Sequence, residues 1–182
     1  MNLAFSTKWK PSMPEGMAGN PTHFVEKILH SFSNMNDDIL SNWIDSIILA
    51  KKQGCYDSEF AESLEGTKGK IHTLRENKSK RWNTDRTIHY VINQRTPQQF
   101  RFWEAPVTNM ELVELKCTNE HRHEIDIYIN NFALNMDERK KFAENDGFDY
   151  WKQFHSWFYP MIQKTKNNSL KLDLIQWTDF RY

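Results

Sequence analysis

The sequence of 182 residues is poor in cysteine, carries no net charge and contains no long apolar run. Its two cysteines, Cys55 and Cys117, are too few for a disulfide framework, which predicts a reducing compartment and, by default, the cytoplasm. No apolar stretch approaches the roughly 18 to 20 residues that cross a bilayer, since Asp45 and Ser46 interrupt the longest patch, residues 44–50. No signal-peptide pattern opens the chain, so we expect no membrane partner.

Motifs that would identify a common enzyme class are also absent. The chain has no Walker loop, no dinucleotide fingerprint and no nucleophile elbow. Cys117, His121 and His123 lie close together in the sequence, but their spacing fits no structural zinc pattern and a fourth ligand is missing. We therefore expect no metal and no cofactor.

What the chain does have is a high aromatic content and enough length for one domain with a core. Aromatic residues make up 14% of the sequence, which argues against disorder. Hydrophobic periodicity predicts strands in which apolar and polar residues alternate and helices with one apolar face. Together these elements indicate an α+β fold. The expected strands are 2–9, 87–93, 100–103, 111–118, 124–129 and 170–177, and the expected helices are 21–32, 37–53, 58–64, 137–144 and 149–158.

Two of the expected helices have clear boundary signals. Asn20 and Pro21 suit a helix N-cap and first turn, after a long loop at 10–21. The helix at 37–53 begins with two aspartates, ends with two lysines and is followed by Gly54. Its inward face is predicted to contain Ile39, Leu40, Trp43, Ile44, Ile47 and Ile48.

Positive charge is concentrated in one part of this neutral chain. Residues 68–86 contain seven basic residues and two acidic ones. Such a local excess beside an aromatic ring predicts an anion site, with phosphate as the first candidate. Within an extended strand, Lys70 and His72 would share one face and Thr73 and Arg75 the other. The backbone must therefore turn or bulge if Lys70 and Thr73 are to converge.

The K-x-x-T-x-R spacing of Lys70, Thr73 and Arg75 resembles the motif of the ASCH family, a branch of the PUA-like superfold. The family glycine would fall at residue 68, which is lysine here, and Gly69 follows one residue late. Ala143–Phe148 is similar to the acidic-Gly-aromatic step that precedes the family's last helix.

The closing segment, Ile175–Asp179, is similar to the final barrel strand of small ASCH-like proteins from bacteria and phages. The resemblance covers roughly residues 60–182. It implies a PUA-like small mixed or antiparallel β-barrel flanked by helices. Residues 1–182 would then form a single domain, with residues 34–66 as an added helical insertion.

The resemblance also implies a possible active site. Some ASCH proteins are amidohydrolases that act on acetylated cytidine, and others are reported as ribonucleases. Carried over to this chain, Lys70 would be the base, Thr73 the nucleophile and Asp146 the third residue. The family has Glu where this chain has Asp146, one methylene shorter. The plainer alternative is that Thr73 is a strand residue and that Lys70 contacts phosphate.

The predicted nucleic-acid or nucleotide contacts surround this motif. Arg75 suits a phosphate or a carboxylate, and Asp146 is an alternative ion-pair partner for it. Trp82 and Trp177 are candidates for stacking on a base, although most tryptophans belong to a core. His72 could act as an acid or base, or be a partly exposed strand residue. The full predicted set is Lys68, Arg75, Lys78, Lys80, Arg81, Trp82 and Trp177.

Three functions are compatible with the sequence. The first is a module that binds RNA, single-stranded nucleic acid or a modified nucleoside. The second is a hydrolase that uses the same pocket, either an amidohydrolase on an acylated nucleoside or a ribonuclease. The third is a protein-interaction domain of phage or bacterial origin, which an exposed apolar face on residues 37–50 would favour.

Overall fold

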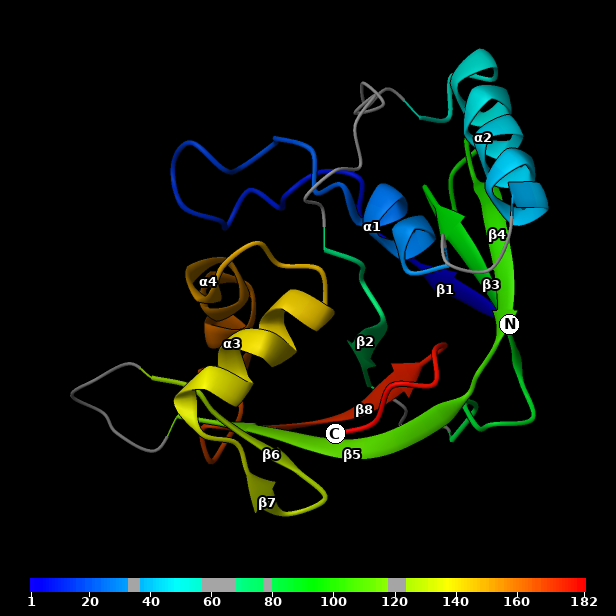
Figure 1. The fold of residues 1–182 in the computed structure, drawn as a ribbon. Coiled ribbons are helices and arrows are strands. Elements are labelled where there is room, and N and C mark those ends of the chain that lie inside the picture. Colours follow the sequence, from blue (N-terminus) through cyan, green and yellow to red (C-terminus); the bar gives the residue numbers. More distant parts are fainter. Residues whose placement is uncertain (33–36, 57–67, 77–79, 118–123) are drawn as a thin grey trace.

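The computed structural model describes residues 1–32, 37–56, 68–76, 80–117 and 124–182. Two sheets and four helices make up this part of the chain, so the predicted α+β class is confirmed (Figure 1). The elements in chain order are β1 (Asn2–Ala4), α1 (Phe24–His30), α2 (Asp37–Lys52), β2 (His72–Arg75), β3 (Thr87–Ile92), β4 (Phe100–Pro106), β5 (Asn109–Lys116), β6 (Asp126–Ile129), β7 (Phe132–Ala133), α3 (Met136–Asn145), α4 (Trp151–Ile162) and β8 (Ser169–Gln176).

The strands divide between a three-stranded sheet and a five-stranded sheet. The smaller sheet has the order β1-β3-β4, with β1 parallel to β3, and the larger antiparallel sheet has the order β2-β8-β5-β6-β7. The chain passes from the smaller sheet to the larger one at Val107 and Thr108. Val107 N donates to Arg86 O (2.9 Å), just before β3, and Thr108 N donates to Gln176 O (2.9 Å) at the end of β8. No closed barrel forms among the described strands, so the expected PUA-like barrel is not confirmed.

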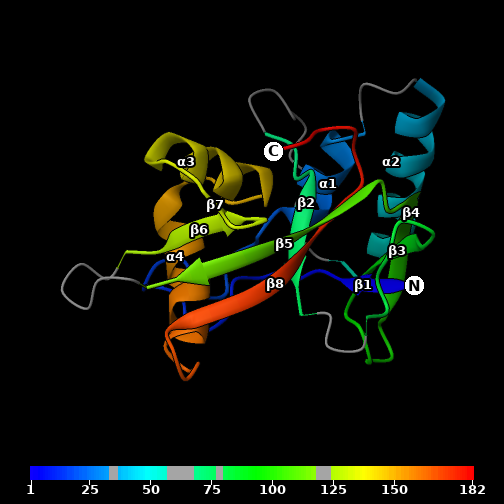
Figure 2. The same cartoon turned by 90° about the horizontal axis from the view of Figure 1, so that it is seen from below.

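The helices build two hydrophobic cores against these sheets. α3 and α4 cover one face of the five-stranded sheet, as the two perpendicular views show (Figures 1 and 2). This core contains Phe142, Phe154 and Phe158 of the two helices, packed on strand residues such as Val113 and Leu172. The other core lies against the three-stranded sheet.

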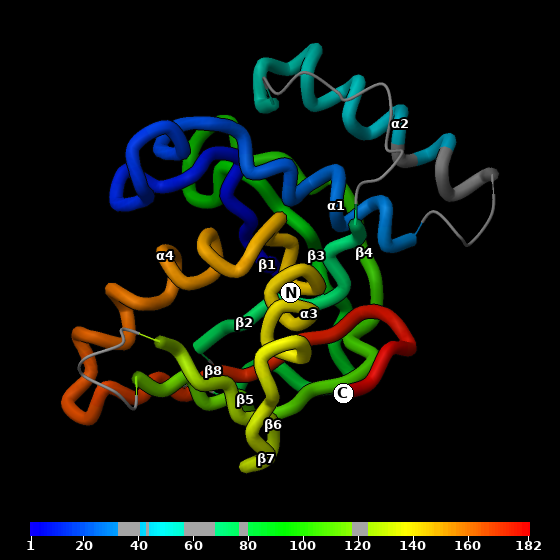
Figure 3. The backbone as a smooth tube through the Cα atoms, turned by 60° about the vertical axis from the view of Figure 1, so that its left-hand side comes forward, coloured from blue at the N-terminus to red at the C-terminus, as the bar shows by residue number. Residues whose placement is uncertain are grey.

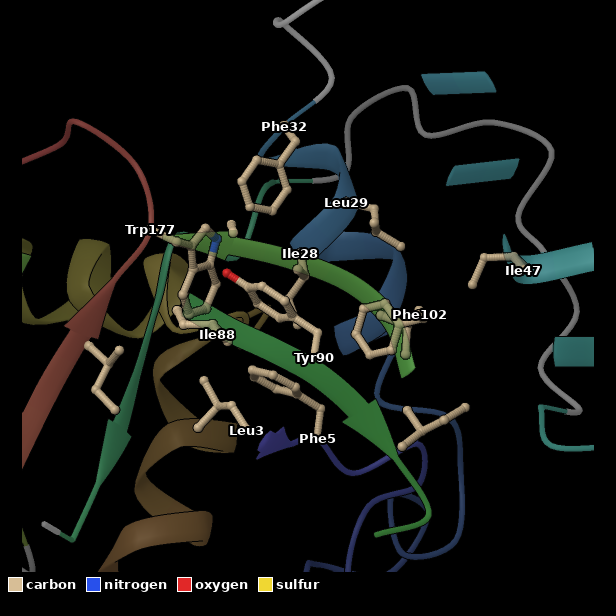
Figure 4. Close-up of a cluster of buried hydrophobic side chains, with 14 of the residues drawn as sticks. Leu3, Phe5, Ile28, Leu29, Phe32, Ile47, Ile88, Tyr90, Phe102 and Trp177 are labelled. Atoms are coloured by element: carbon tan, nitrogen blue, oxygen red, sulfur yellow. The ribbon is translucent and has the colours of Figure 1, made fainter. Parts of the chain in front are cut away.

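The core on the three-stranded sheet is centred on Tyr90, which is surrounded by Phe5, Phe32 and Trp177 (Figure 4). α1 provides Ile28 and Leu29 to the same cluster. Aromatic rings packed against one another in this way stabilise a fold by more than their buried area alone accounts for.

The helix at α2 forms as predicted, but its buried face is narrower than predicted. α2 lies at the periphery along β4, away from α3 and α4 (Figures 1 and 3). Ile47 and Ala50 are buried, whereas Ile44, Ile48 and Leu49 are exposed, with Ile48 at 43%. The predicted inward position of Ile44 and Ile48 is therefore wrong. The side chains of Ile39, Leu40 and Trp43 and the expected helix at 58–64 lie outside the described part.

The start of α1 also differs from the prediction. Asn20 and Pro21 close the loop that precedes the helix: Trp9 N donates to Asn20 O (2.8 Å), and Pro21 forms a bridge with Lys8. The helix begins at Phe24 instead, after His23, which has a positive φ of 54° and makes no side-chain cap. Asn20 and Pro21 therefore close the loop and do not cap the helix. Among the described helices, none has the length and apolar character of a membrane-spanning segment.

Candidate functional site

The end of α3 positions Asp146. This helix has strong local signals, since Asn135 accepts from the backbone N–H groups of Asp137 (3.0 Å) and Glu138 (3.1 Å) in a capping box. At its other end, Gly147 N donates to Glu144 O (2.8 Å) and Phe148 N donates to Ala143 O (3.0 Å).

These two bonds form a Schellman motif, with Gly147 at the left-handed position (φ +90°) and Asp146 as the C-cap. The helix terminus therefore fixes the backbone from which the Asp146 carboxylate projects. The acidic-Gly-aromatic step seen in the sequence is this motif.

Lys70 reaches Asp146 from the segment before β2. Lys70 N donates to Lys27 O (2.8 Å) and Ile71 N donates to Asn145 O (2.9 Å), so this segment is tied to α1 and to the end of α3 before the strand begins. Lys70 Nζ donates to Asp146 Oδ1 (2.5 Å) and also to the Asp146 carbonyl. The two side chains, 76 positions apart, form an ion pair that is almost completely buried: Lys70 is 2% exposed and Asp146 is 3% exposed.

Gly147 leaves room for this contact. A Cβ built at Gly147 would lie 2.9 Å from Lys70 Cδ, closer than Cβ atoms approach their neighbours, and 3.1 Å from Phe24 Cδ1, which is a tight contact. The same turn is held from the other side by Lys27, whose Nζ donates to Gly147 O (2.8 Å) and to Asp149 Oδ1 (2.5 Å). Two buried lysines therefore hold residues 146–149 in place.

A cavity of about 680 Å³ opens beside the Lys70–Asp146 pair. It lies where the two cores meet, because its walls include Phe5 of one core and Phe24, Phe148 and Phe158 of the other. Its polar lining includes buried, half-buried and exposed residues. The buried ones are Lys70, Thr73 and Asp146, and the exposed ones are Glu76, Gln94 and Arg95.

The parallel pairing of β1 and β3 explains how distant segments reach this cavity. Ala4 is paired with Val91, and Phe5 N donates to Val91 O (2.9 Å). Parallel strands end at the same edge of a sheet, so residues 4–7 and 93–95 leave the sheet side by side. The end of β2 and the helix α4 supply the facing walls.

Burial changes the acid–base properties of the ion pair. It lowers the pKa of Lys70 to about 8, and the attraction of Asp146 opposes that shift. It also raises the pKa of Asp146, against the effect of Lys70 and Arg75. Desolvation disfavours both charged forms, and each partner partly restores the charge of the other. Lys70 is thus brought close to the range in which a lysine can accept a proton near neutral pH.

Arg75 lines the same cavity without a carboxylate partner among the described residues. Its guanidinium donates to the Ala4 carbonyl and lies over the Phe5 ring, 5.5 Å from the ring centroid. Burial lowers the pKa of Arg75, with Asp146 opposing, but an arginine remains charged. The Asp146 carboxylate is bonded to Lys70 and not to Arg75, so the alternative in which Asp146 is the ion-pair partner of Arg75 is wrong.

Thr73 also reaches the cavity, as the irregular backbone at residues 70–71 allows Lys70 and Thr73 to line one space despite their spacing. On the strand, Thr73 is paired with Ile175 of β8. Its hydroxyl makes no hydrogen bond to any described residue, and Lys70 Nζ is engaged by Asp146 and not by Thr73. The hydroxyl is thus available to a ligand.

His72 is buried, contrary to the expectation of a partly exposed residue. Its Nδ1 lies 3.0 Å from the Tyr182 hydroxyl, and its ring packs on Phe142. Burial holds the pKa of His72 well below its usual value, with Lys70 adding to the effect. His72 does not line the cavity.

The remaining predicted binding residues lie away from the cavity. Lys68 forms an exposed ion pair with Glu144 (2.7 Å), and Lys80 and Arg81 are exposed on the chain before β3. None of the three lines the cavity. Lys78 lies outside the described residues.

The two tryptophans proposed for base stacking are core residues. Trp177 is 2% exposed, packs edge-on against Tyr90 and donates from Nε1 to Ser31 Oγ (3.1 Å) (Figure 4). Trp82 is buried in the same core. Rings covered on both faces cannot stack on a base, so these two assignments are wrong.

Sequence reasoning missed Phe24, Phe148, Trp157 and Arg95, which line the cavity. Phe148 belongs to the acidic-Gly-aromatic step and could have been noticed there. The others reach the cavity through tertiary packing, for which no local signal exists. His121 and His123 lie outside the described residues, within which no group of His, Cys, Asp or Glu side chains is arranged to hold a metal.

Comparison of the chain with protein-family models, with curated proteins and with solved structures gives no match in any of the three.

Proposed function

We propose that the cavity beside Lys70 and Asp146 binds a modified nucleoside, or one nucleotide of a single-stranded nucleic acid such as RNA. The observation that carries this proposal is the convergence of Lys70, Thr73, Arg75 and Asp146 on one cavity.

The walls of the cavity suit a base and a sugar. Phe24, Phe148 and Trp157 offer apolar aromatic surface, on which nucleobases stack in many single-strand binding sites. The Thr73 hydroxyl is free to hydrogen-bond. The volume of about 680 Å³ lies within the range of small-molecule sites.

The charges favour an anionic or electron-rich ligand. Lys70 and Asp146 neutralise each other, whereas Arg75 has no carboxylate partner among the described residues. A cation that is removed from water without a counter-charge is costly, and a ligand that supplies one stabilises the site. A base inside a duplex would not reach such a cavity, so an unpaired base is the expected partner.

A titration of nucleosides and short single-stranded oligonucleotides tests this proposal. We expect Arg75→Gln to weaken binding by roughly tenfold or more, the usual effect of losing a charge-assisted hydrogen bond. Arg86→Asn removes an exposed arginine that does not line the cavity and is the matched control. Equal weakening by both variants, or none by Arg75→Gln in a folded protein, would contradict the proposal.

A hydrolase is the second candidate, because the pKa of Lys70 is lowered to about 8 and the same cavity contains the Thr73 hydroxyl, which no described residue holds. In this role Thr73 Oγ1 would attack the acyl carbon of an acylated nucleoside, and neutral Lys70 would accept the hydroxyl proton. The acyl C–N bond would then break, the nucleoside amine would leave with the proton held by Lys70, and water would hydrolyse the acyl-threonine ester and release the free acid. To accept the proton, Lys70 would have to leave its bond to Asp146. A ribonuclease would place a phosphodiester, instead of an amide, at the same point.

Turnover measurements separate the hydrolase from a binding module. If the cavity is catalytic, Thr73→Ala should abolish hydrolysis of an acylated nucleoside and leave its affinity nearly unchanged, since only the nucleophile is lost. Measurable affinity without turnover by the wild type, across a panel of acylated nucleosides, would reject the hydrolase. Membership of the ASCH family, with its PUA-like barrel, remains a prediction that is based on the K-x-x-T-x-R motif.

A further inference from the structure

We infer that Arg95, an exposed residue of the cavity lining, binds a phosphate group of the ligand, so that the ligand is a nucleotide unit and not a free nucleoside. This inference rests on the proposed function and specifies the class of ligand. Arg95 lies outside the K-x-x-T-x-R motif and outside the basic stretch at 68–86.

The charge balance of the cavity is the first argument. Three cationic side chains and two carboxylates line it: Lys70, Arg75, Arg95, Glu76 and Asp146. The buried carboxylate is already bonded to Lys70, and the other one, Glu76, is exposed to solvent. The lining therefore has an excess of positive charge that a neutral nucleoside would leave unbalanced and a phosphate would balance.

The second argument is that the turn holding Arg95 is well fixed. Asn93 and Arg95 have positive φ angles of 51° and 67°, a region that non-glycine residues rarely occupy without support. That support comes from Asn93 Nδ2, which donates to Cys55 O (2.6 Å), and from Arg95 N, which donates to Gln99 Oε1 (3.0 Å). The turn thus holds the backbone of Arg95 at the cavity without using its guanidinium.

The third argument is that the Arg95 guanidinium is free for a ligand. No carboxylate among the described residues pairs with it, whereas Arg101 and Arg139 each contact one. A planar guanidinium with unused donors is the side chain best matched to a phosphate. Because Phe24 and Phe148 of the cavity wall are buried and Arg95 is exposed, the base would lie inward and the phosphate nearer to the solvent.

The test compares each common ribonucleoside with its 5′- and 3′-monophosphates by calorimetric titration. We expect the wild type to bind one monophosphate series roughly tenfold more tightly than the nucleosides, and this advantage to shrink as salt is added. Arg95→Asn should remove the advantage, so that the monophosphates bind no more tightly than the nucleosides. Asparagine tolerates positive φ, so the turn should persist. Arg95→Lys should restore part of the advantage.

Arg86→Asn is the control, since Arg86 is exposed at the opposite end of the same strand, β3. A short single-stranded oligonucleotide distinguishes the two sources of phosphate: tighter Arg95-dependent binding of the oligonucleotide identifies a phosphodiester, and of the monophosphate a free nucleotide. Equal affinity of nucleosides and monophosphates would overturn this inference alone. Failure of every nucleoside, nucleotide and oligonucleotide to bind would overturn the proposed function as well.

Discussion

At the scale of single residues, the buried Lys70–Asp146 pair determines what the cavity can do. Such a pair is expensive to bury, and losing one partner usually costs several kcal/mol because the other charge is left unpaired. The pair is retained in an aromatic environment, next to Arg75, which has no carboxylate partner among the described residues, so charged groups line the cavity. For this reason the proposed function assigns the pair to the site.

The lowered pKa of Lys70 leads to a prediction about pH and stability. Its pKa is about 8 in the folded protein, below the ordinary lysine value of 10.5, so between these values the unfolded chain binds more protons. Lys70 should therefore make the free energy of unfolding rise with pH across this window. Below about pH 8 the lysine is charged in both states, and its burial lowers the free energy of unfolding by the full amount. Urea denaturation from pH 7.5 to 10.5 would measure this.

Two variants isolate the contribution of Lys70 in that experiment. Lys70→Met should remove the rise, because the titrating group is gone. Lys68→Met, which removes an exposed lysine two residues away, should retain it. Identical pH profiles for the wild type and Lys70→Met would show that Lys70 titrates like an ordinary lysine.

Gly147 gives a prediction about backbone geometry. Gly147→Ala should destabilise the protein because alanine is strained at φ +90° and its Cβ would meet Lys70 at 2.9 Å. Gly19→Ala has a similar φ of +81° but open space around it, so it isolates the cost of the dihedral angle. We expect Gly147→Ala to cost about 1 kcal/mol or more beyond Gly19→Ala in chemical denaturation. Equal costs would mean that the turn moves away from Lys70 freely.

At the scale of elements, local signals located most helices and strands and several of the faces they bury, such as that of β3, but not how much of α2 is covered. The capping box of α3, the charged ends of α2 and the alternation in β3 all depend on neighbouring residues, so the sequence contains them. Whether a face of a helix or strand is buried depends on residues that are distant in the sequence. The stripe on α2 predicted a wide buried face, yet its packing against β4 covers only part of that stripe.

A pair of substitutions on α2 tests this narrower face. Ile47→Lys should cost several kcal/mol because it buries an unpaired charge in the core around Tyr90. Ile48→Lys, one residue later on the exposed side, should change stability by no more than about 0.5 kcal/mol. Thermal or urea denaturation measures both. A large loss with Ile48→Lys would mean that this side of α2 is covered, whereas a small one leaves it open to the protein partner of the third interpretation.

At the scale of the whole molecule, the cavity is a product of topology. The motif identified Lys70, Thr73 and Arg75 because their types and spacing are visible in the sequence, and the family resemblance added Asp146. The parallel pairing of β1 with β3 and the meeting of two cores are not visible there, and they bring Phe5 and Arg95 to the same space. For the same reason the sequence did not show that Trp82, beside the basic stretch, and Trp177, on the closing segment, are core residues.

A crystal structure of the protein with its tightest nucleoside, nucleotide or oligonucleotide ligand tests the central claim most directly. We predict that the ligand lies in the cavity, with its base against Phe24, Phe148 or Trp157 and a polar group within hydrogen-bond distance of Arg75 or Thr73. A ligand found instead on the exposed basic segment at 80–86, with the cavity empty, would contradict the account.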